Sequence, residues 1–450
     1  MIKRKLNYHV FGFKILFFSL CLSITSCSKD EVAPQQEIAQ EEEEEVVEEE
    51  EQNNFPRLTD NEDRFYTDNI PNTENTLQLS GIQSAADSNL LNQEILNLSN
   101  TGGGIIKITG GTYYLLDVKL RSNVQLKFDA DVIIQPDLSG NTLNKNLNIF
   151  DIGNEFLVQN SAITNSQQNS VDSSTWFTVV IPTGDYRGVR VAEFSYAHNF
   201  QMSGLKIEDT NSVFSSIVLN LSDSNSKDEI SNNGIIKDII ATDSHVGYGI
   251  VQIQAGITIL FKNLDGEGGS TLRVETGVST INMDNQLTVD DVVGRNIIGR
   301  FGDGVLTFSP HRVDQGRVDV ENIVAINSTY AVRLAAGFLD NSGTLDNIGT
   351  FNNLSYVGNI TCTGGNGAQI KSKDYPFFNC VDRQIIIDSL WNVDEESKSG
   401  KSIGVFRDNS SQASGCEDGC YEVNIENINI TNDDFENGAD YIINSMKINC

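Results

Sequence analysis

Residues 271–277 (Thr-Leu-Arg-Val-Glu-Thr-Gly) place an arginine and a glutamate two residues apart in a β-forming segment. Side chains alternate along a strand, so Leu272 and Val274 would face a core while Arg273 and Glu275 would share the outer face. A guanidinium beside a carboxylate can bind an anionic ligand and hold an acid group next to it. The segment therefore predicts acid–base chemistry on an anionic substrate.

The same alternation in other β-runs turns further polar side chains outward. Gln252, Glu275, Thr307 and Arg333 are separated by 23, 32 and 26 residues, each about one coil of a solenoid. Strands in adjacent coils lie about 4.8 Å apart, so these side chains are expected to form one polar row.

Arginine replaces lysine in this part of the chain. No lysine occurs between Lys262 and Lys371, whereas six of the fourteen arginines do: Arg273, Arg295, Arg300, Arg312, Arg317 and Arg333. Guanidinium groups bind sulfate or carboxylate oxygens bidentately, which a lysine ammonium cannot do. Arginines that only balance nearby aspartates are the alternative, but the missing lysines favour a cleft for a sulfated or carboxylated polysaccharide.

Asn-Ile and Asn-Leu pairs mark a weak repeat. They begin at Asn263, Asn296, Asn322, Asn353 and Asn427, with Asp238-Ile239 as a variant, and the first intervals are 25, 33, 26 and 31 residues. A β-run follows about ten residues after each of Asp238, Asn263, Asn296 and Asn322. These runs lie at 250–253, 272–276, 305–308 and 331–334. Such irregular periods with several short strands are typical of a right-handed parallel β-helix.

We therefore predict an all-β solenoid domain over residues 64–450. A short helix at 84–98, capped by Ser84 or Asp87, is expected to cover its N-terminal end, with a first strand at 104–108. A β-sandwich or barrel is the alternative, but these folds need shorter strand spacing and hairpin turns.

The N-terminus carries export signals. Residues 1–26 have the basic start and apolar run of a signal peptide, and the small residue before Cys27 resembles a lipoprotein lipobox. The glutamate-rich residues 27–63 are expected to form a disordered tether. We expect an outer-membrane lipoprotein exposed at the cell surface, with lipidated Cys27 as its only membrane contact.

The net charge of −31 argues against nucleic acid as a partner. The cysteines after Cys27 are Cys362, Cys380, Cys416, Cys420 and Cys450, in a context that permits disulfides. Cys416 could pair with Cys420 and Cys362 with Cys380, but sequence does not decide the connectivity. His311 is the only histidine beyond residue 250, so a zinc site is improbable.

Several separate motifs resemble the iota-carrageenases of glycoside hydrolase family 82. These are 111–114 (Gly-Thr-Tyr-Tyr), 119–124, 131–134, 233–236 (Asn-Gly-Ile-Ile), 247–252 (Gly-Tyr-Gly-Ile-Val-Gln), 260–264, 267–269, 272–276 and Pro310-His311. The resemblance is collinear from about residue 80 to 340. It implies a right-handed β-helix that hydrolyses β-1,4 linkages of iota-carrageenan, a sulfated galactan, with inversion.

The resemblance also implies roles for single residues. Glu275 matches the general acid, for which a raised pKa is expected, and Gln252 and His311 match other active-site positions. Arg273, Arg333, Arg312 and Tyr248 are expected to bind substrate. Family members place an aspartate base two residues after the acid, where this chain has Gly277. Asp340, which matches a family glutamate, is the first candidate for a replacement base, before Asp303 and Glu267.

Two other functions remain open. Without the aspartate, the chain could be a weak or non-catalytic surface protein that binds sulfated galactan. A polysaccharide lyase on the same fold is the third possibility. No metal site and no required cofactor is expected, while structural Ca²⁺ or Na⁺ is allowed, and we expect a monomer.

Overall fold

The computed structural model describes residues 56–139, 146–222, 229–276, 288–339, 346–440 and 442–450. The predicted signal peptide, Cys27 and most of the predicted tether lie outside these ranges, as do Gly277 and Asp340. Residues Arg57–Cys450 form one compact unit. In the described part of the chain, no helix has the length and apolarity to cross a membrane.

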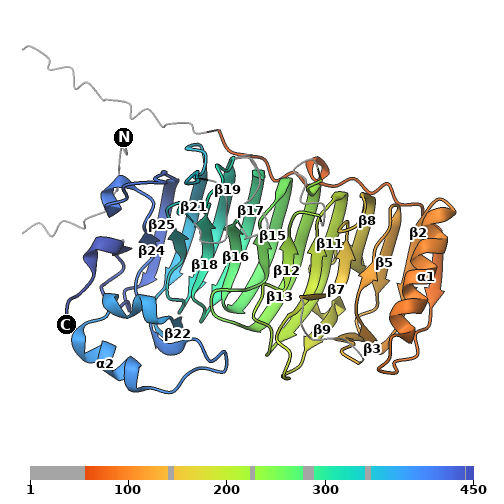
Figure 1. The fold of residues 1–450 in the computed structure, drawn as a ribbon, viewed down its shortest axis with the longest axis horizontal. Coiled ribbons are helices and arrows are strands. Elements are labelled where there is room, and N and C mark those ends of the chain that lie inside the picture. Colours follow the sequence, from red (N-terminus) through yellow and green to blue (C-terminus); the bar gives the residue numbers. More distant parts are fainter. Residues whose placement is uncertain (1–55, 140–145, 223–228, 277–287, 340–345, 441) are drawn as a thin grey trace, which may run out of the picture. The chain divides into compact units, whose positions relative to one another are not determined.

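Two stacks of parallel strands build this unit, and Figure 1 shows the strands side by side in successive coils. The larger sheet runs in the order β1 (Glu74–Leu77), β2 (Gly104–Ile108), β5 (Val124–Phe128), β8 (Val158–Asn165), β11 (Ala197–Asp209), β13 (Asn232–Ser244), β15 (Gly256–Gly268), β17 (Val289–Arg300), β19 (Val318–Ile326), β21 (Tyr356–Thr363) and β25 (Asn424–Asn432). Side strands of this sheet are β3 (Gly111–Leu115), β6 (Val132–Pro136) and β9 (Phe177–Ile181).

The second sheet takes one short strand from each coil. Its order is β4 (Val118–Lys119), β7 (Leu147–Ile152), β10 (Val189–Phe194), β12 (Ile217–Leu219), β14 (Val251–Ile253), β16 (Ser270–Glu275), β18 (Gly304–Ser309), β20 (Val332–Leu334), β24 (Phe406–Asp408) and β26 (Ile442–Ile443). The predicted parallel β-helix is thereby confirmed, and the β-runs predicted at 250–253, 272–276, 305–308 and 331–334 correspond to β14, β16, β18 and β20.

The core lies between the sheets and is made by the inward side of each strand. Leu272, Val274, Leu306 and Phe308 have no exposed surface. Each of these residues packs with side chains of neighbouring coils in one continuous apolar cluster. The chain can therefore bury its apolar surface only when coils stack.

Helix α1 (Ala86–Asn100) covers the first coil, as predicted, and buries Leu91, Ile95 and Leu98. Neither predicted cap residue acts as one. Ala85 is the N-cap residue, and the Asp87 carboxylate instead accepts hydrogen bonds from the backbone N–H groups of Ser80 and Gly81. Strand β1 precedes β2 and pairs with it, so the strand at 104–108 is not the first.

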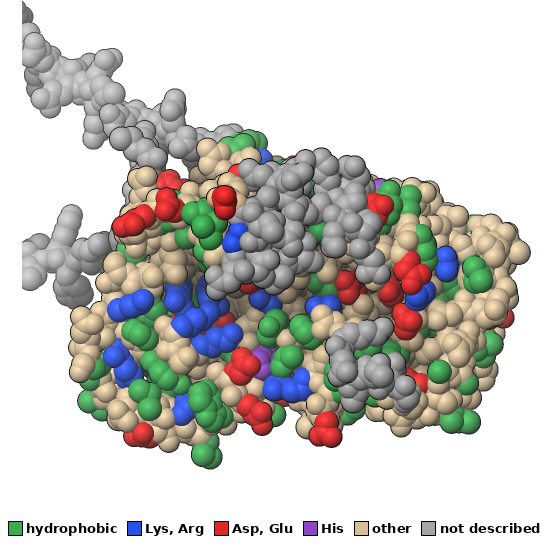
Figure 2. Space-filling model, in the orientation of Figure 1, with side chains coloured by type: hydrophobic (Ala, Val, Ile, Leu, Met, Phe, Trp, Pro, Cys, Tyr) green, Lys and Arg blue, Asp and Glu red, His purple; other side chains and the backbone are tan. Residues whose placement is uncertain are grey.

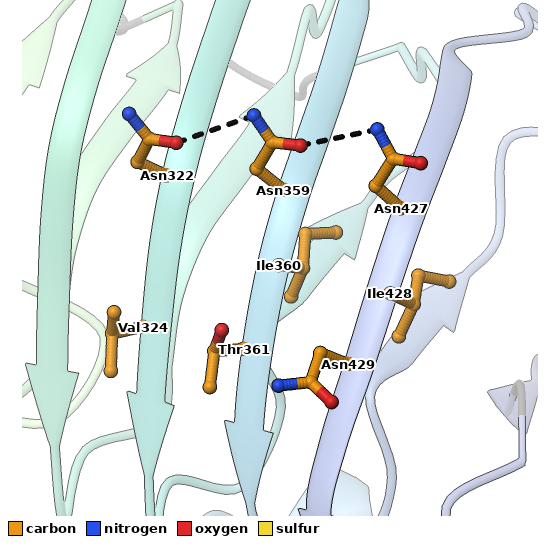
Figure 3. Close-up of a pocket in the computed structure, with 8 residues that line it drawn as sticks. All are labelled: Asn322, Val324, Asn359, Ile360, Thr361, Asn427, Ile428 and Asn429. Carbon is orange, nitrogen blue, oxygen red and sulfur yellow. Dashed lines mark hydrogen bonds between the residues drawn. The ribbon is translucent and has the colours of Figure 1, made fainter.

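Left-handed asparagines form a ladder at one corner of the coils. Asn263, Asn296, Asn322, Asn359 and Asn427 have φ between 52° and 59°. Each side-chain amide donates to the preceding rung, and Asp238 is the first rung, bonded at 2.7 Å. Figure 3 shows three of these rungs. The predicted repeat is this ladder, with one correction: Asn359, and not Asn353, occupies the fourth asparagine rung.

A shallow pocket of about 420 Å³ opens beside this ladder, between the rungs and the following residues of β19, β21 and β25. Its lining contains amide, hydroxyl and aliphatic side chains but no ionisable group. It lies on the larger sheet, whereas Glu275 belongs to the other one. We assign no chemistry to it.

Residues 57–70, which we call the strap, run across the outer face of the larger sheet. The Arg57 guanidinium contacts Glu426 of β25 at 2.7 Å, and Leu58 binds the Asp319 carboxylate of β19 at 2.9 Å. The short 3₁₀ helix η1 (Glu62–Arg64) pairs Glu62 with two lysines, of β13 and β15. The strap includes residues 57–63, which the sequence analysis assigned to the tether.

An excursion of the chain between β21 and β24, residues 364–405, projects from the last coils. It contains the antiparallel pair β22 (Asn366–Ile370) and β23 (Lys398–Lys401), the 3₁₀ helix η3 (Ser372–Phe377) and helix α2 (Cys380–Asp388). Short 3₁₀ helices also occur at η2 (Ser173–Thr175), η4 (Gln412–Ser414) and η5 (Asn444–Met446).

Two disulfides stabilise the C-terminal region. Cys416 pairs with Cys420, one of the predicted options, whereas Cys380 pairs with Cys450. The predicted Cys362–Cys380 bond is wrong, because Cys362 points from β21 into the apolar core and is free.

Candidate active site

Strand β16 holds Arg273 and Glu275 on the outer face of the smaller sheet. Leu272 and Val274 fill the core on its other side, which fixes the orientation of the strand. The predicted alternation is therefore confirmed. Arg273 is 8 % exposed and the Glu275 side chain 19 %, so both charges lie largely out of water.

Three polar side chains surround Glu275. The Arg273 guanidinium forms an ion pair with the Glu275 carboxylate and donates to the Gln252 Oε1 atom at 3.3 Å. The Gln252 amide donates to the Glu275 carbonyl oxygen at 3.3 Å. His311 Nε2 lies 3.5 Å from Glu275 Oε1, opposite the arginine. The sequence-predicted Gln252, Arg273, Glu275 and His311 thus form one cluster.

Tyr248 and Phe338 add aromatic surface to this cluster. The Arg273 guanidinium lies over the Tyr248 ring, 4.9 Å from its centre. The His311 ring packs against Phe338, with 4.4 Å between ring centres. Phe338, which the sequence analysis missed, is 43 % exposed and would offer an apolar face to a sugar ring.

The strand register corrects the predicted row. Gln252, Arg273, Thr307 and Arg333 are successive partners on β14, β16, β18 and β20. Glu275 pairs with Ser309 instead, because coil lengths differ and residue intervals do not give register. Arginines thus occupy the row on β16 and β20, and Glu275 lies beside the row on the same face.

The electrostatics of Glu275 differ from the expected ones. Burial raises its pKa, but the charge of Arg273 and the hydrogen bond and charge of His311 outweigh burial and lower the pKa to about 2. The raised pKa expected for a general acid is therefore wrong for the ligand-free protein. Arg273 and His311 thus favour the ionised form of Glu275.

The remaining predicted residues lie elsewhere. The Arg333 guanidinium binds the fully buried Asp303 carboxylate at 2.6 Å, two strands from Arg273. Arg312 is buried next to His311. Glu267 is exposed at the end of β15, in the larger sheet. Asp340, the preferred candidate base, is outside the described residues.

The row continues in both directions beyond the predicted residues. Towards the N-terminus it runs through Val218 to Glu193 and Asp151, and towards the C-terminus it reaches Arg407. Figure 2 shows this division, with Lys and Arg side chains gathered over the C-terminal coils and Asp and Glu side chains over the coils before them. Strict alternation over 189–194 (Val-Arg-Val-Ala-Glu-Phe) would turn Glu193 to the side of the core residues Val189 and Val191, so the sequence pattern does not identify it.

Among the residues with described positions, no three His, Cys, Asp or Glu side chains are grouped to hold a metal ion. The chemistry available to the site is that of a carboxylate, an imidazole and guanidinium groups.

These features define the class of the protein as a right-handed parallel β-helix with a carboxylate–arginine–histidine cluster on one outer face. Comparisons with known proteins find relatives among the iota-carrageenases. The chain is 34 % identical to an iota-carrageenase of Zobellia galactanivorans over 256 residues, which are 56 % of this chain and 50 % of that protein. It is 30 % identical to an iota-carrageenase of Alteromonas macleodii over 262 residues, 58 % of this chain and 52 % of that one.

The predicted resemblance to iota-carrageenases is therefore confirmed, although the chain spans about half the length of these curated relatives. Solved structures extend the similarity in fold. An iota-carrageenase of family GH82 from A. fortis superposes with a TM-score of 0.74 and 23 % identity, covering 88 % of this chain and 94 % of that one. An iota-carrageenase complexed to iota-carrageenan fragments gives a TM-score of 0.70, 21 % identity and coverages of 88 % and 98 %. No family model matches the chain.

Proposed function

We propose that this protein is an endo-acting glycoside hydrolase that cleaves β-1,4 linkages of iota-carrageenan with inversion. The observation that carries the proposal is the Glu275 carboxylate held between Arg273 and His311, in a chain that is 34 % identical to an iota-carrageenase over 256 residues. The row of arginines beside it suits a sulfated polymer.

Substrate binding raises the pKa of Glu275 and so allows it to act as a general acid. A sulfate ester that binds Arg273 neutralises the guanidinium charge next to Glu275 and adds a negative charge, and both effects raise the carboxyl pKa. Exclusion of water by the sugar rings acts in the same direction. Protonated Glu275 then donates its proton to the glycosidic oxygen as the bond to the anomeric carbon breaks.

Inversion needs a second carboxylate that activates water on the opposite side of the sugar. Asp303 is fully buried and bound to Arg333, and Glu267 belongs to the other sheet, so neither suits this role. We propose Asp340 as the base, with Gln252 and His311 orienting the substrate and the acid. Arg312 and Tyr248 complete the proposed binding residues.

The lowered pKa of Glu275 also favours a second candidate, a surface protein that binds sulfated galactan without cleaving it. A carboxylate that stays ionised can order an arginine for sulfate binding and need never lose or gain a proton. In that case Gly277 is the natural consequence of a lost hydrolytic function.

Incubation of the full-length protein with iota-carrageenan separates these functions. The hydrolase releases reducing ends with time, and Glu275→Gln lowers the rate by about 10²–10⁴-fold, the usual contribution of a general acid. Full activity of Glu275→Gln would exclude the assignment. Sugar binding without release of reducing ends indicates the binding protein, and products with an unsaturated sugar indicate a lyase.

We further propose that the protein is a monomeric lipoprotein, held at the outer cell surface by a lipid on Cys27, and that it needs no cofactor. The Cys27→Ala variant should lose incorporation of labelled fatty acid and leave the membrane fraction. Incorporation that persists in this variant would refute the anchor. Activity after dialysis against a chelator tests the cofactor statement.

A further inference from the structure

The C-terminal excursion brings two lysines to the arginine end of the polar row. Strand β22 leads directly into Lys371, the N-cap residue of η3, and Lys373 follows within η3. Gln369 fixes this segment, since its Oε1 accepts from the Gly269 N–H at 2.7 Å and its amide donates to the Ser244 carbonyl at 3.1 Å. The lysines are thus tied to the loop that opens β16.

Lys371 reaches back over the coil of Tyr248. A Cβ atom on Gly247 would lie 2.3 Å from the Lys371 Nζ atom and 3.9 Å from Asp303 Oδ2, and Gly247 has φ of +78°. The backbone conformation favours glycine here, and the Lys371 ammonium group lies close to this position. Lys371 belongs to the same charged group as Asp303 and Arg333.

Cations outnumber carboxylates in this group. Arg333 binds Asp303, and Arg407 binds Asp374, which also accepts from the Tyr330 hydroxyl at 3.3 Å. Both carboxylates are fully buried, so each is committed to its arginine. Lys371 and Lys373 add two further positive charges. Lys373 is exposed and Arg333 partly exposed, so solvent reaches both side chains.

We propose that Lys371, Lys373 and Arg333 form a second oxyanion subsite, which binds a sulfate ester of the polysaccharide on the C-terminal side of the cleavage point. This inference rests on the proposed function. Arg333 lies two strands from Arg273, about 10 Å along the stack, which is comparable to the length of a disaccharide. The protein therefore requires sulfate on two successive repeats, one held at Arg273 and the next at the lysines.

The chemical state of Lys373 supports this role. Although Lys373 is exposed as a residue, desolvation of its ammonium group by the surrounding protein and the nearby positive charges of Arg333 and Lys371 lower its pKa to about 8, against the opposing charges of Asp303 and Asp374. Arg407 and Tyr330 belong to the same group through their contacts with Asp374. Lys373 is a cation below pH 8 and loses its charge above it, so a sulfate held there is released as the pH rises.

The test is calorimetric binding of an iota-carrageenan oligosaccharide to the full-length Glu275→Gln protein, which prevents cleavage. At pH 7, adding Lys373→Gln should weaken binding about tenfold, a loss of about 1.4 kcal/mol. The exposed Lys447→Gln, outside this cluster, is the matched control and should bind as the parent does. In the Glu275→Gln protein with Lys373 intact, Kd should rise as the pH passes 8. Adding Lys373→Arg should remove that rise because arginine keeps its charge.

Equal affinities of the Lys373→Gln and Lys447→Gln proteins, or a pH dependence that survives Lys373→Arg, would overturn the subsite. A chemically desulfated oligosaccharide should bind equally to all variants, and a tenfold loss there would show a merely structural role. If the parent protein binds no sulfated oligosaccharide at all, the proposed function fails and not only the subsite.

Discussion

At the scale of single residues, neighbouring charges decide what each carboxyl group on the outer face of the smaller sheet can do. Glu275, between Arg273 and His311, has a pKa of about 2. Asp151 lies four strands away on the same face, at the acidic end of the polar row. Burial, Glu193 and Asp117 raise its pKa to about 7. One face thus contains a carboxylate that resists protonation and a carboxyl group that resists ionisation.

Asp151 should make stability depend on pH in a defined direction. Its folded pKa lies above the unfolded value of about 3.9, so the folded state is destabilised as the pH rises from about 4 to about 7. Asp151→Asn removes this cost. The variant should be more stable by about 2–4 kcal/mol at pH 8 and unchanged near pH 4, as measured by urea unfolding.

The exposed Asp185→Asn is the control for this experiment and should change stability at neither pH. A gain for Asp151→Asn that is equal at pH 4 and pH 8 would show that packing, and not ionisation, causes it.

At the scale of elements, the corner asparagines explain why the repeat could be found in the sequence. Asparagine tolerates the left-handed conformation and its amide both donates and accepts, so one residue type meets both needs of a stacked corner. Asn322 has φ of 59° and bonds to Asn296 and Asn359 at 3.2 and 3.3 Å.

Asn322→Ala should lower the free energy of unfolding by about 1–2 kcal/mol, because alanine loses both bonds and is strained at this φ. Asn322→Gly should cost less, since glycine accepts the conformation. Urea denaturation of the two variants measures the difference. A glycine variant that is no more stable than the alanine variant would show that backbone conformation is not the cause.

The sequence predicted those features that depend on local pattern. Alternation gave the inward Leu272 and Val274 and the outward Arg273 and Glu275, and periodicity gave α1 and the coil strands. Register was not predictable, because coils differ in length, and Arg273 took the place assigned to Glu275. The pKa of Glu275 and the position of Lys373 beside Arg333 depend on contacts between distant segments, for which no local pattern exists.

At the scale of the whole solenoid, the strap joins coils that otherwise contact only their neighbours. Arg57 binds β25 in the last coils, and Ile70 packs with Ile105 of β2 and Ala162 of β8 in the first ones. Between them, Phe65 and Tyr66 pack on apolar side chains of β13, β15 and β17. One segment therefore spans strands from both ends of the larger sheet.

Phe65 is fully buried by these strands. Phe65→Ala should lower the free energy of unfolding by about 3–5 kcal/mol, the usual cost of removing a buried aromatic ring. Denaturant unfolding measures this loss, with the exposed Ile82→Ala as a control. A loss below 1 kcal/mol would mean that the strap is docked too weakly to hold the coils together.

The strap also sets an order of events in time. It is the first part of the solenoid to be synthesised, yet Arg57 and its partner Glu426 are 369 residues apart, so its docking site is complete only after the last coils have stacked. Coil stacking itself needs only neighbouring segments and can proceed along the chain. Contacts formed this late are absent from the folding transition state, and losing them should speed unfolding while leaving the folding rate almost unchanged. The strap therefore docks last during folding, and its contacts determine how slowly the folded protein unfolds.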